Sequence, residues 1–455
     1  MILYKITTKA VFPEGVAPGA GMSSNRQILA RNGKGQTLLR GTALAGILRS
    51  SFPEELREQW FGEALNGDSG TSEKDAPVES KIRVADAVLN AEVTERTHNL
   101  VNRHTGAVIK GGLFALEALP PKTSATLSIS IASERECDEI IRQLANVLGR
   151  ELLVGGNSNR GIGRMVLDSP LHCRMFDLST IEGTADWMDA EYEERSNGAV
   201  LSGEKIVPKA DENALHINVV FKIPRGEDLL VGDGQALDYT LQPQRVGDAD
   251  GNERWRIPGS TLRGIIRGWM TRLAVREGKK QVRDSYEHWD QQFNEGGQTY
   301  KPDMIGWGFV EDKEERKKIG SHPDQLSDPI LNLFGSMYRK GRIHIADSFS
   351  RTCKDADVQE RMHVAIDRFS GGSNEGALFS NQVLTAQDLL FPVTIRITNP
   401  DPEEVGWLVM TLRAIHLGIL SIGSSKSSGR LEIHSICANG NESEPVNAFA
   451  KEINQ

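Results

Sequence analysis

The chain has few cysteines and no long apolar run. Its 455 residues include four cysteines, which stand far apart and form no C-x-x-C pair: Cys137, Cys173, Cys353 and Cys437. This spacing disfavours a disulfide framework or a zinc knuckle and fits a reducing cytosol. No apolar stretch approaches the roughly 20 residues that span a bilayer. The N-terminus lacks a basic region followed by an apolar one, so we expect no signal peptide, no membrane partner and a cytoplasmic location.

Charge of one sign is also not in large excess. The 62 acidic residues outnumber the 53 basic ones, for a net charge of -9. An acidic balance argues against non-specific binding to nucleic acid, which depends on many contacts between basic side chains and phosphates. It leaves room for a local basic groove, because charges act over a Debye length of about 8–10 Å. A hydrophobic share of 38% can fill cores, and the length predicts two or three domains.

The sequence repeats itself in five blocks that keep the same order in both halves. The matched blocks are Arg40–Gly46 with Pro258–Gly264, Trp60–Gly62 with Leu333–Gly335, Lys81–Asp86 with Arg342–Asp347, Val101–Arg103 with Ile366–Arg368, and Arg160–Arg164 with Lys426–Arg430. The separation between partners drifts from 218 residues at the first pair to 266 at the last, which indicates insertions, mostly in the second copy. The chain is therefore predicted to be an internal duplication.

Each copy is predicted to have the element order β-α-β-β-α-β, which is that of the ferredoxin-like split βαβ unit. The expected strands are Ile2–Phe12, Lys81–Leu89, Ala125–Ile131 and Gly163–Leu167 in the first copy, and Leu215–Ile223, Arg342–Phe349, Pro392–Ile397 and Gly429–Ile433 in the second. First helices are expected from Thr42 and Ser260. Second helices are expected after a capping box at Ser133–Glu136 and at Asp401, with a proline in the first helical position.

These patterns predict an α+β fold of two tandem domains. The first covers residues 1–176 and the second 212–440, with an acidic linker of little periodicity at 177–211. A highly charged insert at about 271–326 is expected to be a solvated elaboration of the second domain, followed by a C-terminal tail at 441–455.

A glycine-rich turn that follows the second helix in each copy is the first candidate binding element. Glycines let a backbone approach a phosphate and present N–H donors, while basic side chains supply charge. The candidate RNA-binding residues are Gly155, Gly156, Asn157, Arg160 and Arg164 in the first copy, and Gly423, Ser424, Ser425, Lys426 and Arg430 in the second. The alternative interpretation is a flexible connection that uses glycine and serine for its turn geometry.

The start of the first helix is the second candidate element. Ser260 is expected to cap the helix, whose first turn would offer N–H groups to an anion. Arg263 and Arg267 stand four residues apart, hence on one helical face. Arg40 and Arg49 lie on the matching segment of the first copy and complete the set. The alternative here is an ordinary capped helix with solvated arginines.

Together, the five blocks and the two glycine-rich turns resemble the RAMP superfamily, specifically the backbone subunits of type III CRISPR effectors. The tandem arrangement is similar to the two-copy subunits of the III-D branch. The resemblance implies an RRM-like core in each copy and a thumb hairpin that interrupts the guide–target duplex, arising after Asn99 and after Val364. It also implies the partners: crRNA, single-stranded target RNA, neighbouring backbone subunits and the large subunit.

The same resemblance implies a cleavage site. Many such subunits cut target RNA with an aspartate in the loop before the first helix, here Leu230–Leu241. Asp238 best fits that position, with Asp233 in reserve. The carboxylate would bind a divalent ion, Mg²⁺ in our expectation, or draw the proton from a ribose 2′-hydroxyl. The first copy has Asn25 near this place, and its loop Glu14–Gln27 holds no aspartate, so that copy is expected to bind RNA without cutting it.

Other interpretations stay open at this point. Asp238 could be a solvated loop residue, and the chain a purely structural scaffold for guide and target. A guide-processing endonuclease or an unrelated α+β metabolic enzyme are further alternatives. Arg263 or Arg267 would stabilise the charge on the phosphorane if cleavage occurs. We expect His98, His104, His344 and His363 to be structural or surface residues, and Asp86 and Asp347 to be mainly structural carboxylates.

Overall fold

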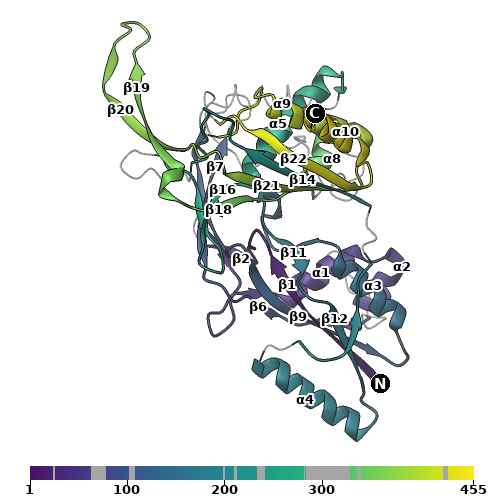
Figure 1. Ribbon diagram of the computed structural model, residues 1–455. Helices are drawn as coiled ribbons and strands as arrows, with labels where there is room; N and C mark the ends of the chain where they lie inside the picture. The colour runs from purple at the N-terminus through teal and green to yellow at the C-terminus, as the bar shows by residue number, and fades with distance from the viewer. Residues whose placement is uncertain are drawn as a thin grey trace, which may run out of the picture. The chain divides into compact units, whose positions relative to one another are not determined.

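The computed structural model describes residues 1–23, 26–62, 78–101, 108–197, 200–209, 213–232, 241–280, 282, 328–335, 340–423 and 429–454 (Figure 1). The chain divides into two compact units. Unit 1 comprises Met1–Glu95, Leu116–Ser158 and Ile162–Glu212, and unit 2 comprises Arg96–Ala115, Asn159–Gly161 and Asn213–Gln455. Among the described residues, no helix has the length and apolar character needed to cross a membrane.

Unit 1 is built on the antiparallel pair β1 (Ile2–Phe12) and β9 (Thr123–Ser133), which stay in register along all of β1. Strand β5 (Ile82–Val84) pairs with the other edge of β9. On its far side, β1 pairs with β11 (Arg164–Leu167) and β12 (Leu171–Asp177). Helices α1 (Gly41–Ser51) and α3 (Asp138–Gly149) pack on each other, and α3 buries its apolar stripe.

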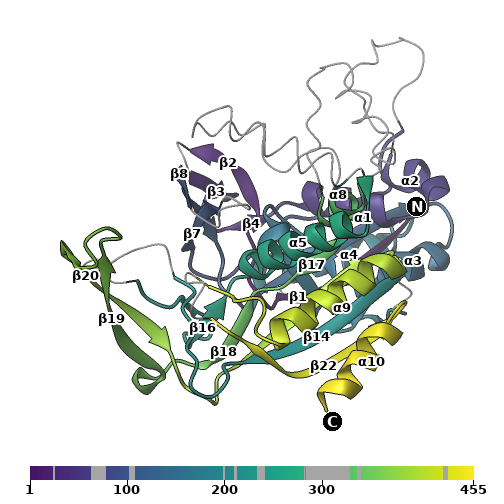
Figure 2. The ribbon, with the colours of Figure 1, turned by 90° about the horizontal axis from the view of Figure 1, so that it is seen from above.

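Unit 2 repeats this plan with a sheet in the order β17 (Ile343–Ile345), β21 (Leu390–Thr398), β14 (Ala214–Lys222) and β22 (Glu432–Gly440). Each neighbouring pair is antiparallel. Helices α5 (Gly259–Arg276) and α9 (Pro402–His416) lie side by side over the sheet (Figure 2). Alternate residues of β14 point to one face of the sheet, and this apolar face packs in the core with residues of α5 and α9.

In both sheets the first of the four predicted strands (β1, β14) pairs with the third (β9, β21), the second (β5, β17) pairs with the other edge of the third, and the fourth (β11, β22) pairs with the other edge of the first. This is the ferredoxin-like order, so the predicted fold of two tandem α+β domains is confirmed. The two thumb-like hairpins are present as β7 (Thr94–Val101) with β8 (Val108–Ala118), and β19 (Val358–Ile366) with β20 (Ser373–Leu384). Figure 1 shows β19 and β20 projecting as a long arm from unit 2.

Further elements complete the two units. They are β2 (Gly19–Ser23), β3 (Arg26–Leu29), β4 (Leu38–Leu39), α2 (Glu54–Phe61), β6 (Ala87–Val88), β10 (Leu152–Leu153), the 3-10 turn Ser158–Arg160, α4 (Ile181–Asn197), β13 (Glu204–Ile206), β15 (Arg245–Gly247), β16 (Glu253–Ile257), α8 (Pro329–Phe334), β18 (Ser348–Thr352), the 3-10 turn Asp355–Asp357 and α10 (Glu444–Ile453).

The capping signals of the second helices had different outcomes. Asp401 caps α9 by accepting the Glu403 N–H, with proline in the first turn, as predicted. The capping box expected from Ser133 is wrong. Strand β9 runs on to Ser133, and α3 begins only at Asp138 without a side-chain cap. Pairing with β1 holds the serine in the sheet, which a local motif cannot show.

The segment 177–211, expected to be a linker, instead carries α4 and β13. Helix α4 belongs to unit 1, where Lys5 pairs with Glu191 and Glu194, and Ala190 and Trp187 join a small apolar cluster around Phe176. The helix has no single apolar stripe, so its sequence shows little periodicity. Its charged side chains nevertheless make the ion pairs with Lys5. The expected tail forms α10, which buries Val446 and Phe449. Helix α5 continues to Arg276, beyond the expected start of the charged insert, and most of that insert lies outside the described residues.

Candidate nucleic-acid interface

In each unit, an aspartate accepts a hydrogen bond from the first backbone amide of the first helix. The aspartate follows a strand that lies far along the chain from that helix. The Gly41 N–H donates to Oδ1 of Asp86 at 2.7 Å, and the Gly259 N–H donates to Oδ1 of Asp347 at 2.8 Å. The two carboxylates therefore do the structural work expected of them, by satisfying an amide that a helix start leaves without a partner. The repeated geometry places the same backbone frame in both halves of the chain.

Ser260 does not cap α5, so that expectation is wrong. The N-cap residue is Pro258, and no side chain of the cap residue accepts a hydrogen bond. The oxygen comes from Asp347, 88 residues away along the chain. Only a residue without a side chain fits the first helical position, since a Cβ on Gly259 would lie 2.3 Å from the Ile345 carbonyl oxygen.

The glycine-rich turns also share one frame. In unit 1 the Val154 N–H donates to the Gly163 oxygen at 2.7 Å, and the Gly163 N–H donates to the Gly15 oxygen at 2.8 Å. In unit 2 the Ile422 N–H donates to the Gly429 oxygen at 2.7 Å, and the Gly429 N–H donates to the Asp228 oxygen at 2.8 Å. These bonds close each turn and join it to the loop that follows the first strand. The turn then passes close to the loop before the first helix. A Cβ on Gly155 would lie 2.8 Å from the Ala17 oxygen, and one on Gly423 would lie 2.3 Å from the Leu230 oxygen.

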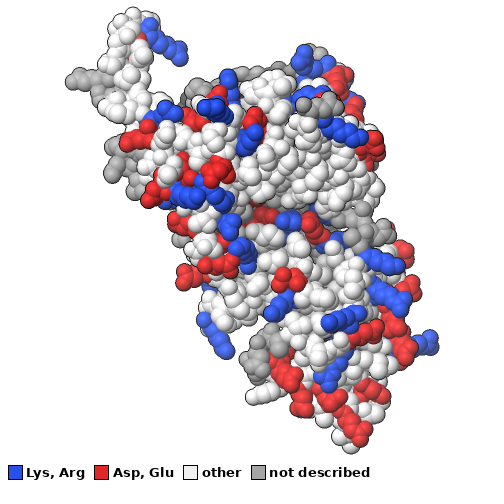
Figure 3. All heavy atoms as spheres, in the orientation of Figure 1, with Lys and Arg blue, Asp and Glu red and all other residues white. Residues whose placement is uncertain are grey.

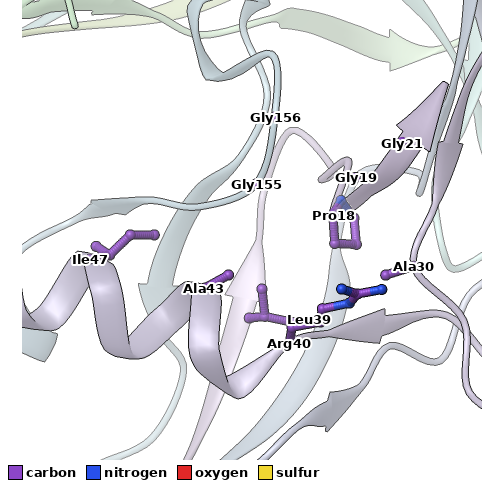
Figure 4. Close-up of a pocket in the computed structure, with 10 residues that line it drawn as sticks. All are labelled: Pro18, Gly19, Gly21, Ala30, Leu39, Arg40, Ala43, Ile47, Gly155 and Gly156. Atoms are coloured by element: carbon purple, nitrogen blue, oxygen red, sulfur yellow. The ribbon is translucent and has the colours of Figure 1, made fainter. Parts of the chain in front are cut away.

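In unit 1 the turn and the helix start enclose a pocket of about 470 Å³. Its walls come from the loop after β1, the start of α1 and the glycine-rich turn: Pro18, Gly19, Gly21, Ala30, Leu39, Arg40, Ala43, Ile47, Gly155 and Gly156. The Arg40 side chain is exposed and extends toward Pro18 and Ala30 (Figure 4). The structure thus brings together three predicted binding residues, Arg40, Gly155 and Gly156.

The other basic residues of the first copy have different surroundings. Arg164 is committed to two carboxylates, with Nη2 at 2.7 Å from Glu14 and Nη1 at 2.8 Å from Glu151. Although burial opposes its charge, these carboxylates raise the pKa of Arg164, so this side chain is a structural cation. Arg160 lies 4.5 Å over the Phe114 ring, and Arg49 is half-buried on α1. Asn157 takes a left-handed conformation with φ 61°, as a tight turn requires.

In unit 2 the predicted arginine face of α5 turns inward. Arg263 donates to the carbonyl oxygens of Ile343 and Phe334, and burial lowers its pKa to about 10. Arg263 and Arg267 both lie over the Phe334 ring, at 5.1 and 6.0 Å from its centroid. Arg263 therefore anchors the helix to the sheet, and the phosphorane-stabilising role expected of it has no support. Arg430 is 59% exposed and pairs with Glu227 at 3.3 Å.

The candidate acids and part of the second turn lie outside the described residues: Asn25, Asp233, Asp238, Ser424, Ser425 and Lys426. The two ends of the acid-bearing loop are described. Gly232 bridges to Pro243, and the Gln244 side chain donates to the Gly232 oxygen at 2.7 Å. The Gln382 N–H of β20 donates to the Leu241 oxygen at 2.9 Å. Both ends of the loop are thus held next to the base of the second hairpin.

A buried charged cluster in unit 2 escaped the sequence analysis. Arg96 donates to Oδ2 of Asp347 at 2.5 Å, and Arg256 lies 3.9 Å from the same oxygen. The His98 ring stacks on Phe114 with centroids 5.5 Å apart. The structural role predicted for His98 fits this packing. The contact between Arg96 and Asp347 joins residues 251 positions apart, and no local motif marks such a pair.

Charge does not single out one face in the view of Figure 3, where basic and acidic side chains are interspersed. Among the described residues, no group of three His, Cys, Asp or Glu side chains could hold a metal ion. The candidate interface is therefore defined by its shape, its glycines and a few basic side chains.

Comparison with known proteins agrees with the duplicated frame. The sequence model of the RAMP superfamily matches residues 19–166 and again residues 239–432, one match in each half. No curated protein matches the chain. RAMP proteins work with RNA and other subunits in CRISPR ribonucleoprotein complexes, and some of them are ribonucleases.

Proposed function

The chain belongs to the RAMP superfamily in both of its halves, and on that premise we propose that it is a crRNA-binding backbone subunit of a type III CRISPR ribonucleoprotein. Its partners are the crRNA, single-stranded target RNA, neighbouring backbone subunits and the large subunit. One observation carries the proposal: in each unit, a glycine-rich turn lies against the loop that precedes the first helix.

The pocket of unit 1 suits a ribonucleotide segment. Its volume of about 470 Å³ lies within the range of small-molecule sites. Glycines at positions 19, 21, 155 and 156 leave the backbone open to close approach, and Arg40 supplies a positive charge beside them. Its aliphatic lining, with Leu39, Ala43 and Ile47, can pack against a sugar or a base edge. Contacts of this kind read the RNA backbone more than its sequence.

Removing the Arg40 charge tests this step. We expect Arg40→Ala to weaken binding of the guide RNA about tenfold and to lower the salt slope of the binding constant by about 0.7, the loss of one phosphate contact to a single strand. Arg83→Ala is the matched control, because Arg83 is an exposed arginine of the same unit that does not line the pocket. Filter binding at several salt concentrations measures both quantities. Equal behaviour of the two variants would remove the pocket from the interface.

We further propose that the second unit cleaves target RNA with Asp238, and that Asp233 is the alternative acid. The support is the sequence position of the acid and the anchoring of both loop ends beside β20. The carboxylate takes the proton of a ribose 2′-hydroxyl, and the oxygen attacks the adjacent phosphorus. The bond to the 5′-oxygen breaks, which leaves a 2′,3′-cyclic phosphate, and the 5′-oxygen takes a proton from water to become a hydroxyl. A divalent ion, Mg²⁺ in this proposal, would neutralise phosphate charge at Asp238. The described residues offer no alternative ligand cluster for it.

Cleavage is tested in the assembled complex with guide, target and Mg²⁺. Asp238→Asn should lower the rate of cutting at this subunit's position at least about 100-fold while guide binding stays within twofold. Asp233→Asn tests the reserve assignment, and Asp250→Asn is the control in a neighbouring turn. A wild-type complex that holds target RNA without cutting it at this position would instead favour the purely structural scaffold.

A further inference from the structure

Helix α4 has an outer face of apolar side chains that the described part of the chain leaves uncovered. The outer face consists of four exposed residues: Ile181, Ala185, Met188 and Tyr192. Ile181 is 90% exposed, Met188 61% and Tyr192 74%. Spacings of four, three and four residues place these side chains on one side of a helix, in the pattern by which two helices pack. Figure 1 shows α4 beside β12, at the lower end of the view.

The opposite side of α4 attaches the helix to unit 1. Trp187 and Ala190 join the small apolar cluster of that unit, and Lys5 pairs with Glu191 and Glu194. Apolar residues thus lie on two opposite sides of α4, which is why no single apolar stripe marks it. The outer face takes no part in this attachment, so a partner would meet a helix that is already folded and would not bear the cost of ordering it.

A row of acidic side chains runs along one flank of the outer face. Each member follows one residue of the outer face and is therefore turned about 100° from it around the helix. The acidic row consists of four exposed residues: Glu182, Asp186, Asp189 and Glu193. Asp186 lies 3.5 Å from Arg174, and within the described residues no ion pair engages the other three. The helix sequence contains one basic residue, Arg195, so the negative charge of this flank is largely uncompensated.

The outer face and the acidic row together define the chemistry of a partner. A helix with its own apolar stripe at the same spacing can interdigitate with the outer face. Basic side chains beside that stripe would meet the acidic row, and opposite charges in such flanking positions set which helices pair. A second copy of α4 fits less well, because it brings another acidic row on a chain of net charge -9. Methionine and tyrosine, both present in the outer face, are enriched in contacts between proteins.

We propose that the outer face of α4 docks a basic amphipathic helix of another protein. The partner helix packs its apolar stripe on Ile181, Met188 and Tyr192, and its lysine or arginine side chains pair with the acidic row. The proposal goes beyond RNA binding and does not depend on it, since α4 contributes no residue to the pocket or to the glycine-rich turns.

Two synthetic peptides test this chemistry on the full chain. Both have three heptads with leucine in the two stripe positions, and they differ by lysine or glutamate in the flanking positions, so that neither pairs readily with itself. Fluorescence anisotropy of the labelled peptides measures binding at about 0.15 M salt, where distant charges are screened. We expect the wild-type chain to bind the lysine peptide at least about tenfold more tightly than the glutamate peptide.

Substitution in the outer face locates the binding. Met188→Gln removes an apolar side chain without a change of charge and should weaken binding of the lysine peptide at least about fivefold. The matched control is Val78→Gln, since Val78 is 55% exposed in the same unit and lies outside α4. This control should bind the lysine peptide within about twofold of the wild type.

Charge reversal in the acidic row tests selection by charge. The double substitution Asp189→Lys and Glu193→Lys should remove the preference for the lysine peptide. Glu54→Lys with Glu55→Lys makes the same change in net charge on the exposed surface of α2, and this control should keep the preference. A preference lost equally in both would be an effect of net charge and would count against docking on α4.

Three further results would overturn the proposal. One is a wild-type chain that binds the two peptides equally or binds neither. Another is a Met188→Gln chain that binds the lysine peptide as Val78→Gln does, including the case in which it loses affinity for guide RNA alone, since the outer face would then bind RNA. The third is self-association of the wild-type chain in sedimentation velocity that Met188→Gln abolishes, because a second copy would then be the occupant.

Discussion

Asp86 and Asp347 occupy equivalent positions in the two units, but their surroundings differ. Asp86 is exposed and binds one backbone amide. Asp347 is 3% exposed and binds an equivalent amide together with Arg96, and Arg256 lies nearby. The same aspartate position is thus exposed to solvent in unit 1 and part of a buried charged cluster in unit 2. The difference teaches that the frame is conserved between the halves of this chain while its use is set by what packs on it.

Substitution of each aspartate by alanine should give the largest difference in the free energy of unfolding between the two units. Asp347→Ala leaves two buried arginine side chains without their carboxylate, and we expect a loss of about 3–5 kcal/mol in the free energy of unfolding. Asp86→Ala removes only a helix cap and should cost about 1 kcal/mol. Urea unfolding followed by tryptophan fluorescence measures both. Equal costs would mean that the buried cluster adds nothing to the cap.

Alanine substitution in the glycine-rich turn should lower the stability by a similar amount in the two units. Gly163 and Gly429 have φ values of 86° and 87°, and a Cβ would meet the Val154 and Ile422 oxygens at 2.4 and 2.0 Å. Substitution by alanine at either position should cost at least about 2 kcal/mol, from left-handed strain and the clash.

The control for the turns is Gly226→Ala. Gly226 has a φ of 84° with open space where the Cβ would stand, so only the strain of about 1 kcal/mol is expected. The three variants are compared by their urea midpoints. A large difference between the variants at 163 and 429 would break the equivalence of the two frames.

The smallest effect concerns pH and the first hairpin. Burial, followed by the charges of Arg96, Arg160 and Arg256, lowers the pKa of His98 to about 3. The unfolded histidine, with a pKa of about 6.5, takes up a proton between pH 7.5 and 5.5 while the folded one does not, so stability should fall by about 1.4 kcal/mol over that range. His98→Asn should remove this loss.

The exposed counterpart provides the control for this prediction. His363→Asn is the matched control, because His363 is the exposed counterpart in the second hairpin and the predicted loss at low pH is assigned to the buried His98. Urea unfolding at pH 7.5 and 5.5 is measured for the wild type and for both variants. A loss at low pH that survives in His98→Asn would assign it to other groups.

Much of the architecture could be predicted from local patterns. The alternation of apolar residues in Ile2–Phe12 predicts β1 with its observed bounds, and the Asp401-Pro402 pair predicts the start of α9. Helix α4 was missed because only two of its residues, Ala190 and Trp187, join an apolar cluster, and ion pairs with Lys5 supply the rest of its attachment. The cap of α5 was misassigned because the oxygen comes from a residue far along the chain.

The candidate interface was predictable in its glycines and only partly in its charges. The positions of Gly155 and Gly423 follow from the repeated turn, since backbone geometry excludes other residues there. Which arginines face solvent does not follow. Arg40 is exposed, whereas Arg164 and Arg263 have the same residue type and are held by carboxylates or carbonyl oxygens inside the fold.

The amino-acid sequence by itself determined the duplication, the order of elements in each half and the places where only glycine fits, because these depend on residue type and spacing along a short stretch of chain. The tertiary structure decided that Asp347 is buried while Asp86 is exposed, and that Arg96 of the first hairpin is held in a buried ion pair while Arg361 of the second is half exposed. Burial and pairing join residues that are distant in sequence, and they set the energy of a charge more strongly than the identity of its neighbours along the chain.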